Sequence, residues 1–178
     1  MTTPSYFIEQ LSLPASLDAA DAEEFLEFTE LCDELIQQTW GNLDRASSAS
    51  ARLQYWRDTP YTRMRLFFVR VDGRMVGSSW VRCELQENLR SALLPVGVLE
   101  SFAGAGIGRA MLAHAEALAA ADGRTILQTF TEHPAGFDDG RTNLVTPATG
   151  SGALPADARG VRFAARAGYR LEQVERFS

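Results

Sequence analysis

The pattern of apolar and polar positions changes period in the middle of the chain. Residues 93–99 are almost continuously apolar and short enough for a buried strand. Residues 101–108, the glycine turn, follow with a glycine at every second position from Gly104. From Ile107 onward, apolar residues recur every three or four positions, which predicts an amphipathic helix. The predicted order is therefore strand, glycine turn and helix. The apolar face of this helix comprises Ile107, Met111, Ala115 and Leu118.

The clearest of the other patterns is a hairpin. Two β-rich runs, 65–71 and 74–83, flank Asp72-Gly73, a pair typical of a two-residue hairpin turn. Gly77 within the second run favours a β-bulge or the close approach of another backbone. The remaining predicted elements are a strand at 6–13, a helix at 19–39 that begins after Ser16 or Asp18 and ends at Gly41, a short helix at 51–57, a strand at 124–131, a helix at 155–167 capped by Gly168, and a strand at 169–177.

Composition narrows the class of protein. The 178 residues are 46% hydrophobic and 22% charged, which fits one globular domain with a real core. The net charge of −6 disfavours a nucleic-acid partner. Cys32 and Cys83 lack the spacing of metal ligands, so no metal site is predicted. The sequence shows neither a signal-peptide pattern nor a membrane-spanning run, so we expect no membrane partner and a cytoplasmic location.

The glycine turn and the helix after it are suited to binding an anion. The first N–H groups of a helix have no partner within the helix, and they lie at the positive end of its dipole. Glycine lets a phosphate approach these groups closely. Residues 105–109 are therefore a candidate cradle for phosphate or pyrophosphate. The alternative is a tight turn in which the glycines serve only the reversal of the chain.

Two anion-binding motifs fit poorly. A P-loop needs a lysine after its glycines, and the chain contains none. A nicotinamide-dinucleotide site needs G-x-G-x-x-G and an acidic residue about twenty positions on. Glu132 suits that second requirement, but the glycines lie one residue too close together and a hairpin precedes them. Dinucleotide binding remains a weaker alternative.

Two motifs resemble the GCN5-related N-acetyltransferases, the GNAT superfamily. Residues 103–112, AGAGIGRAML, are similar to its motif A, although Ala103 replaces the usual Arg or Gln. Residues 157–169 are similar to the pattern N-x-x-A-x-x-F-Y-x-x-x-G-F of its last helix, through Asp157, Gly160, Phe163, Ala164, Gly168 and Tyr169. The first sixty residues and the run GALPADARGVRF resemble the N-terminal half of tandem-GNAT proteins.

The resemblance implies an α/β fold. The expected architecture is a mixed central sheet of about six strands, splayed at an acetyl-CoA cleft and flanked by about four helices. We expect a single GNAT-like domain over 1–178, which comprises a variable N-terminal strand and helices (1–60), the core sheet with motif A (61–132), a long loop (133–156), and the last helix and strand (157–178). The loop is rich in Gly, Pro, Thr and Asp, and it is interpreted as a lid near the acceptor end of the cleft or as plain disorder.

The implied activity is acetyl-CoA-dependent N-acetyltransfer, an acyltransferase reaction, to a small amine-containing acceptor. Acetyl-CoA serves as co-substrate. Backbone groups of Val98 and Leu99 would hold the pantetheine arm, and Asp157 stands where the family often has an asparagine that contacts it. The pyrophosphate would bind to backbone N–H groups of Gly104, Ala105, Gly106, Ile107, Gly108, Arg109 and Ala110.

The catalytic groups are harder to assign. The family's usual general acid is a tyrosine at the position of Ala164, so Tyr169 is the nearest candidate. Glu100, Glu132 and His133 follow the two splayed strands and are candidates for the general base. In the GNAT fold the first helices border the acceptor site, which makes Trp40, Tyr55 and Trp56 candidates to line it. Packing in the core is the alternative for these aromatic residues.

A second functional hypothesis comes from the two missing signature residues, Ala103 and Ala164. The domain can be a catalytically degenerate GNAT-like module with a structural, interaction or CoA-binding role, such as one half of a tandem protein. The GNAT fold usually adds a final strand after 169–177, so this strand is predicted to leave an open edge. The chain is then a fragment of a longer protein with a second GNAT domain, or a second copy pairs with the edge as a homodimer.

Overall fold

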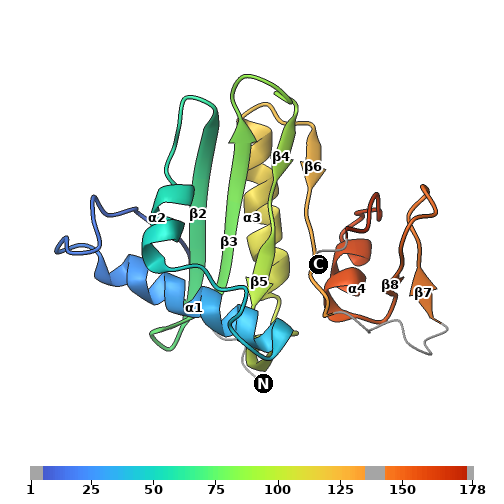
Figure 1. The fold of residues 1–178 in the computed structure, drawn as a ribbon, viewed down its shortest axis with the longest axis horizontal. Helices are drawn as coiled ribbons and strands as arrows, with labels where there is room; N and C mark the ends of the chain where they lie inside the picture. The colour runs from blue at the N-terminus through green and yellow to red at the C-terminus, as the bar shows by residue number, and fades with distance from the viewer. Residues whose placement is uncertain (1–5, 135–142, 176–178) are drawn as a thin grey trace. The chain divides into compact units, whose positions relative to one another are not determined.

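A computed structural model describes residues 6–134 and 143–175 (Figure 1). By its contacts the chain divides into two compact units, Met1–Thr129 and Phe130–Ser178. The two units are described one at a time.

The first unit is built on a six-stranded mixed sheet, as predicted. Its strands have the order β1-β2-β3-β4-β6, and β5 also pairs with β3. All the ladders are antiparallel except that between β4 and β6, which is parallel. The strands are β1 (Ile8–Gln10), β2 (Thr62–Val71), β3 (Arg74–Glu84), β4 (Ser91–Leu93), β5 (Val96–Val98) and β6 (Ile126–Gln128).

The β2–β3 hairpin confirms the sequence prediction. Asp72 and Gly73 have φ angles of 49° and 82°, as a two-residue turn with both central residues left-handed requires. The ladder slips between Val69 and Arg70, which is the bulge expected near Gly77. A Cβ on Gly77 would lie 2.9 Å from Sδ of Met111 and 3.4 Å from the carbonyl oxygen of Gly97. Gly77 therefore lies beside the bulge, and both α3 and the backbone of β5 approach it closely.

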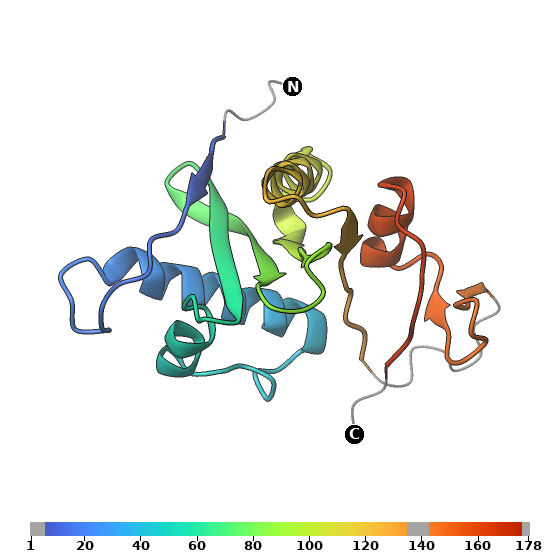
Figure 2. The ribbon, with the colours of Figure 1, turned by 90° about the horizontal axis from the view of Figure 1, so that it is seen from above.

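Helices cover both faces of this sheet (Figure 2). Two neighbouring residues of β2 show the arrangement, because the Phe68 ring packs against Phe28 at 6.5 Å and the Phe67 ring packs against His114 at 4.9 Å. Phe28 and His114 lie on α1 and α3, so these helices occupy opposite faces. The helices of the unit are α1 (Glu23–Trp40), α2 (Ala49–Tyr55), α3 (Ile107–Ala121) and the short 3₁₀ helix η1 (Glu100–Phe102).

The ends of α1 agree with the prediction at one side only. Gly41 ends the helix in the left-handed region with φ 74°, as expected. At the other end the predicted caps, Ser16 and Asp18, are wrong, because α1 begins later, after Ala22, which makes no side-chain cap hydrogen bond. Residues 16–22 instead form turns, in which the Ala19 N–H donates to Ser16 and the Ala22 N–H donates to Ala19.

The aromatic core lies between α1, α2 and the sheet. The Trp56 ring stands edge-on to Phe25 and Phe28, at 6.1 and 5.4 Å, and only 7% of Trp56 is exposed. Trp56 therefore packs in the core, where Arg52 holds α2 against α1 by donating to the Thr29 carbonyl oxygen at 2.7 Å and to Asp33 at 2.5 Å. Trp56 also borders a hollow of about 560 Å³, and its place at an acceptor site stays a prediction.

The predicted strand at 93–99 is interrupted. β4 ends at Leu93, and β5 begins at Val96 with a different pairing. Between them the Leu94 side chain is fully buried, and the Pro95 carbonyl oxygen accepts a hydrogen bond from the Ser79 hydroxyl at 2.6 Å. Proline cannot donate to a ladder, so the break falls where the backbone loses a donor.

The second unit contains one short ladder and one helix. β7 (Leu144–Val145) pairs antiparallel with β8 (Leu154–Pro155), and α4 spans Arg159–Arg166. The loop predicted at 133–156, as a lid or as plain disorder, contains this two-stranded ladder, and its residues 135–142 lie outside the described ranges. Pro155 belongs to β8, so α4 begins four residues later than predicted. Gly168, with φ 91°, follows the helix as expected.

The predicted strand at 169–177 is wrong for residues 169–175, which adopt no strand, while 176–178 lie outside the description. A strand needs a neighbouring ladder, and the described residues supply none here. Instead Val174 packs where a side chain on Gly152 would be, since a Cβ on that glycine would lie 2.7 Å from the Val174 Cβ.

Two further expectations concern metals and membranes. Within the described residues, no group of three or more His, Cys, Asp or Glu side chains could hold a metal ion. None of the helices in the same ranges combines the length and the apolar content needed to cross a membrane.

Candidate functional site

The sheet of the first unit opens where β4 gives way to β5. Three residue pairs join β4 to β6, from Ser91 with Ile126 to Leu93 with Gln128. The last bond of this junction is donated by the Leu94 N–H to the Gln128 carbonyl oxygen at 2.9 Å. Beyond it β5 pairs with β3, and among the described strands it has no ladder to β6. This is the splay that the sequence prediction required.

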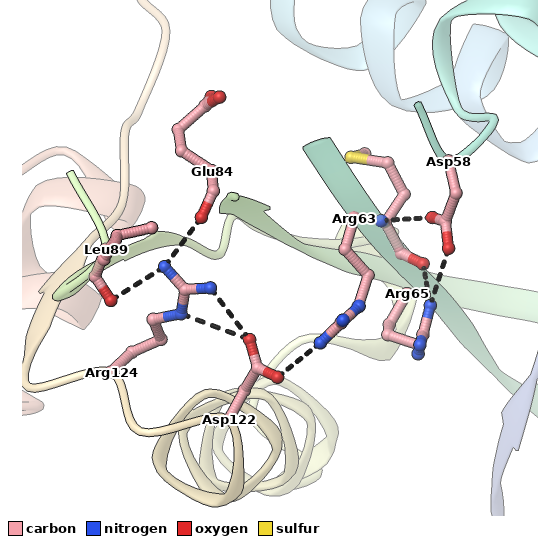
Figure 3. A network of polar contacts seen from close by, with 8 residues as sticks. Asp58, Arg63, Arg65, Glu84, Leu89, Asp122 and Arg124 are labelled. Atoms are coloured by element: carbon pink, nitrogen blue, oxygen red, sulfur yellow. Dashed lines mark hydrogen bonds and ion pairs between the residues drawn. The ribbon is translucent and has the colours of Figure 1, made fainter. Parts of the chain in front are cut away.

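The paired end of this opening is held by a polar network (Figure 3). Arg124, whose side chain is 5% exposed, donates to the carbonyl oxygens of Glu84 at 2.9 Å and Leu89 at 2.8 Å. It also donates to Asp122 through Nε at 3.2 Å and Nη2 at 3.0 Å. Arg63 approaches the same carboxylate at 2.5 Å. Burial alone would raise the pKa of Asp122, but the hydrogen bonds from Arg124 and the charge of Arg63 outweigh it and lower that pKa.

The glycine turn places a helix N-terminus beyond β5. The chain passes through η1, whose Glu100 N–H donates to Gln38 Oε1 at 2.6 Å. It then reverses through Gly104, with φ 81°, and Gly106, with φ 85°. Gly106 is the residue before the first turn of α3, and it provides no side-chain cap. Both positions require the left-handed backbone that glycine adopts most readily.

No described group of the protein accepts a hydrogen bond from the backbone donors at this N-terminus. The first helical bond of α3 runs from the Ala110 N–H to the Gly106 carbonyl oxygen at 3.0 Å. Within the described part of the chain, no N–H group of residues 104–109 donates a hydrogen bond to the backbone or to a side chain. Nothing described lies within 4 Å of where a Cβ of Gly104 would be. The start of α3 is thus a set of oriented donors without a described acceptor, from which the Ala110 N–H is excluded.

In the strand before the turn, the backbone groups of Leu99 and Val98 point in different directions. The Leu99 N–H donates to the Val76 carbonyl oxygen at 2.9 Å, so it is committed to β3. Alternate residues of an antiparallel strand direct their backbone polar groups to opposite sides, and those of Val98 therefore point away from β3. Leu99 is 6% exposed and belongs to the core. Of the two residues expected to bind pantetheine, Val98 has the suitable orientation and the Leu99 N–H does not.

Among the candidate acids and bases, the first unit holds Glu100. Its side chain is exposed and borders a shallow hollow of about 330 Å³, which is also lined by Gln38 and Arg74. A hollow of about 560 Å³ lies elsewhere, beside the start of β2. There the Asp58 carboxylate accepts hydrogen bonds from the Met64 N–H at 2.7 Å and from Arg65 at 3.4 Å, so its role is structural.

The remaining candidates lie in the second unit. Glu132 and Asp157 are exposed, and Asp157 comes just before Ala158, the residue that precedes α4. Tyr169 is half-buried, and its N–H donates to the Ala164 carbonyl oxygen at 3.0 Å, so it is folded back on the end of α4.

A close polar pair precedes α4 in the chain. Oγ1 of Thr131 lies 3.0 Å from Nε2 of His133, and burial lowers the pKa of His133. Thr131 also fills the space where a Cβ on Gly160 would lie, at 2.7 Å from its Cγ2. His133 is among the candidates predicted from the sequence, and Thr131 is not. A single threonine carries no spacing signal, so only the folded structure could identify it.

Comparison with known proteins matches the chain to one family model. The model of the acetyltransferase (GNAT) family covers residues 29–135. A comparison with curated protein sequences finds no match.

Solved structures with the same fold include a tandem GNAT protein from the clavulanic acid biosynthesis pathway. It is 24% identical, with a TM-score of 0.62 over 92% of this chain, and the chain spans 43% of its length. An aminoglycoside acetyltransferase from an uncultured soil metagenomic sample, solved with trehalose, is 16% identical, with a TM-score of 0.61 over 97% of this chain and 94% of its own. AAC(6′)-Iy, solved with a bisubstrate analog, is 14% identical, with a TM-score of 0.60 over 98% and 97%. At these identities the likeness concerns the fold.

Proposed function

The chain belongs to the GNAT family of acetyltransferases, and from that premise we propose that it is an acetyl-CoA-dependent N-acetyltransferase for a small amine. The single observation that carries the proposal is the open N-terminus of α3. Residues 104–109 present backbone donors that no described group accepts, and the resemblance to motif A implies that the cofactor pyrophosphate binds here.

The physical case for a pyrophosphate ligand rests on charge and access. Unpartnered N–H groups at a helix start carry partial positive charge, and Gly104 leaves the approach to them open. Hydrogen bonds to a charged phosphate oxygen are stronger than those to water or to a neutral group. The donors of Gly104, Ala105, Gly106, Ile107, Gly108 and Arg109 would bind the pyrophosphate.

The pantetheine arm would extend along β5. Val98 directs its backbone groups away from β3. An extended amide-containing arm can add to such a strand as another strand does.

The proposed reaction is direct transfer. The neutral amine attacks the thioester carbonyl, the new C–N bond forms, and the C–S bond breaks to release CoA. Binding both substrates in a reactive geometry supplies much of the rate. Glu100 or Glu132 would accept the amine proton, directly or through water, and Tyr169 or solvent would protonate the thiolate. Ala164 has no hydroxyl with which to do so.

A second candidate function is a catalytically degenerate module that binds CoA or a partner domain. Two observations favour it. Ala103 and Ala164 replace the family's Arg or Gln and its tyrosine, and the tandem relative is more than twice as long as this chain. In that case the partner would be a second GNAT domain or a second copy of the chain.

Two measurements separate these functions. Calorimetric titration with acetyl-CoA tests binding, and a thiol-release assay with a panel of small amines and amino-sugars tests turnover. Binding with turnover is the expected result. Binding without turnover for any amine would favour the degenerate module. Absence of acetyl-CoA binding would overturn the acetyltransferase and favour a degenerate module that binds a partner domain, and a parallel titration with NAD would then test the dinucleotide alternative.

A further inference from the structure

We propose that Tyr6 is a ligand-binding residue of the acetyl-CoA site, whose hydroxyl donates a hydrogen bond to a phosphate group at the start of α3. The inference rests on the proposed function and extends it to a residue far from either family motif. Tyr6 precedes the glycine turn by almost one hundred positions, so the fold alone brings the two together.

A row of residues across the sheet explains the placement. Ile8 pairs with Val69, Val69 with Gly77, and Gly77 with Val98. A Cβ on Gly77 would lie 3.4 Å from Cγ2 of Ile107, so the first turn of α3 lies over this row. The beginning of β1 and the beginning of α3 are therefore at the same level of the sheet.

The face of β1 follows from its register. Gln10 pairs with Phe67, whose ring contacts His114 on α3. Side chains alternate along a strand, so Gln10, Ile8 and the preceding Tyr6 lie on the α3 side. Phe7 falls on the other side and is 76% exposed.

The Tyr6 hydroxyl reaches the glycine turn itself. A Cβ on Gly106 would lie 3.8 Å from it, and no other described atom outside the neighbouring residues comes within 4 Å of that position. The Tyr6 side chain is half-buried, and none of the residues described by the structure hydrogen bonds to its hydroxyl. A donor without a protein partner thus stands beside the unpartnered N–H groups of residues 104–109.

The chemistry of these donors selects an anion. Backbone N–H groups can only donate, and the phenolic hydroxyl is able to donate to the same oxygen-rich group. A phosphate that accepts bonds from the helix N-terminus would lie within reach of the hydroxyl. Acetyl-CoA supplies such a group in its pyrophosphate, whereas its acetyl and pantetheine parts have fewer acceptors and no negative charge.

The test compares acetyl-CoA binding by the unmodified chain, by Tyr6→Phe and by Tyr61→Phe. Tyr61 is 62% exposed and comes just before β2. Its substitution also removes a phenolic hydroxyl, but at a position outside the glycine turn. Tyr6→Phe is expected to raise the Kd for acetyl-CoA about tenfold, the size of one hydrogen bond to a charged group. It should also raise the Kd for ADP, used as a competing pyrophosphate probe, by a similar factor. Tyr61→Phe should change neither Kd.

The outcomes are distinguishable from failure of the proposed function. If the unmodified chain binds no acetyl-CoA, both proposals are overturned. If it binds and Tyr6→Phe binds equally well or more tightly, only the role of Tyr6 is overturned. If Tyr6→Phe weakens the binding of acetyl-CoA but not of ADP, the hydroxyl acts on another part of the cofactor and the assignment to the pyrophosphate is wrong. Circular dichroism of each variant checks that its fold is retained.

Discussion

Arg124 and Asp122 form a two-contact ion pair that joins the end of α3 to the chain entering β6. The guanidinium donates through Nε at 3.2 Å and Nη2 at 3.0 Å to one carboxylate oxygen, while its third nitrogen holds two backbone carbonyl groups. The pair thus fixes four segments at the paired end of the splayed strands.

The first prediction is that Arg124→Met destabilises the fold by about 3 kcal/mol, as removal of one partner from a buried pair does. The carbonyl groups of Glu84 and Leu89 lose their donor, and the Asp122 carboxylate loses one of its two cations. Urea unfolding measures the change. Arg90→Met is the control, because Arg90 makes an exposed bond to Thr125 at 3.1 Å and should cost less than about 1 kcal/mol. Equal losses would show that burial of the network is unimportant.

The second prediction concerns acid. The pKa of Asp122 is lowered in the folded chain, so its ionised form stabilises the fold above the unfolded-state pKa of 3.8. That stabilisation is lost as pH falls through the lower folded pKa. The free-energy difference between the unmodified chain and Asp122→Asn should therefore be constant from pH 7 to about pH 5 and shrink below about pH 4. Unfolding curves measured from pH 7 to pH 3 test this, and a difference independent of pH would contradict it.

The third prediction separates the ligand role of the glycine turn from backbone strain. Gly106→Val and Gly123→Val place the same side chain at φ 85° and 76°, before the start and after the end of α3. Both should be destabilised by about 1–2 kcal/mol. Only Gly106→Val should also raise the Kd for acetyl-CoA, by at least about tenfold, because its side chain enters the approach to the backbone donors. Calorimetry on both variants measures this, and equal binding would refute the site.

The fourth prediction concerns the missing acid. With alanine at position 164, protonation of the thiolate is expected to depend little on any one side chain. Tyr169→Phe should then reduce kcat by less than about tenfold, since its backbone bond to Ala164 is retained. Steady-state thiol release measures kcat. A loss of about a thousandfold would identify Tyr169 as the general acid.

The fifth prediction concerns the two thiols. Burial raises the pKa of Cys32 to about 11, and burial also raises the pKa of Cys83. Both stay protonated at pH 8, and the thiolate is the reactive form. Ellman's reagent should therefore label neither cysteine quickly in the folded chain and both in urea. Rapid labelling of one thiol under native conditions would show that its surroundings open.

Local signals in the sequence were sufficient for part of the fold. The Asp72-Gly73 turn, the left-handed Gly41 and the glycine turn before α3 are each fixed by backbone preferences of one or two residues. The helix that begins at Ile107 follows from the period of its apolar face. These features depend on near neighbours, so a single sequence specifies them.

Features that depend on distant partners were missed. The apolar run at 93–99 gave no sign that Pro95 would divide it, because the break depends on which strand pairs with each half. The packing of Trp56 in the core depends on the contact of Arg52 with α1, which fixes α2, so the sequence alone could not predict it. Tyr6 approaches Gly106 only through the register of β1. For the site, motif residues were found and their long-range neighbours were not.

The short parallel ladder between β4 and β6 has a consequence for the order of folding. The β2–β3 hairpin joins residues close in sequence through a long ladder, whereas Ser91 meets Ile126 only after the whole of α3 has been placed between them. Closing that larger loop costs more entropy and is repaid by only three residue pairs. We expect the hairpin to form early and the β4–β6 junction late, and the amides of β6 to exchange with deuterium sooner than those of β2. The junction from which the two strands splay is then also the part of the sheet that the folded chain opens most readily.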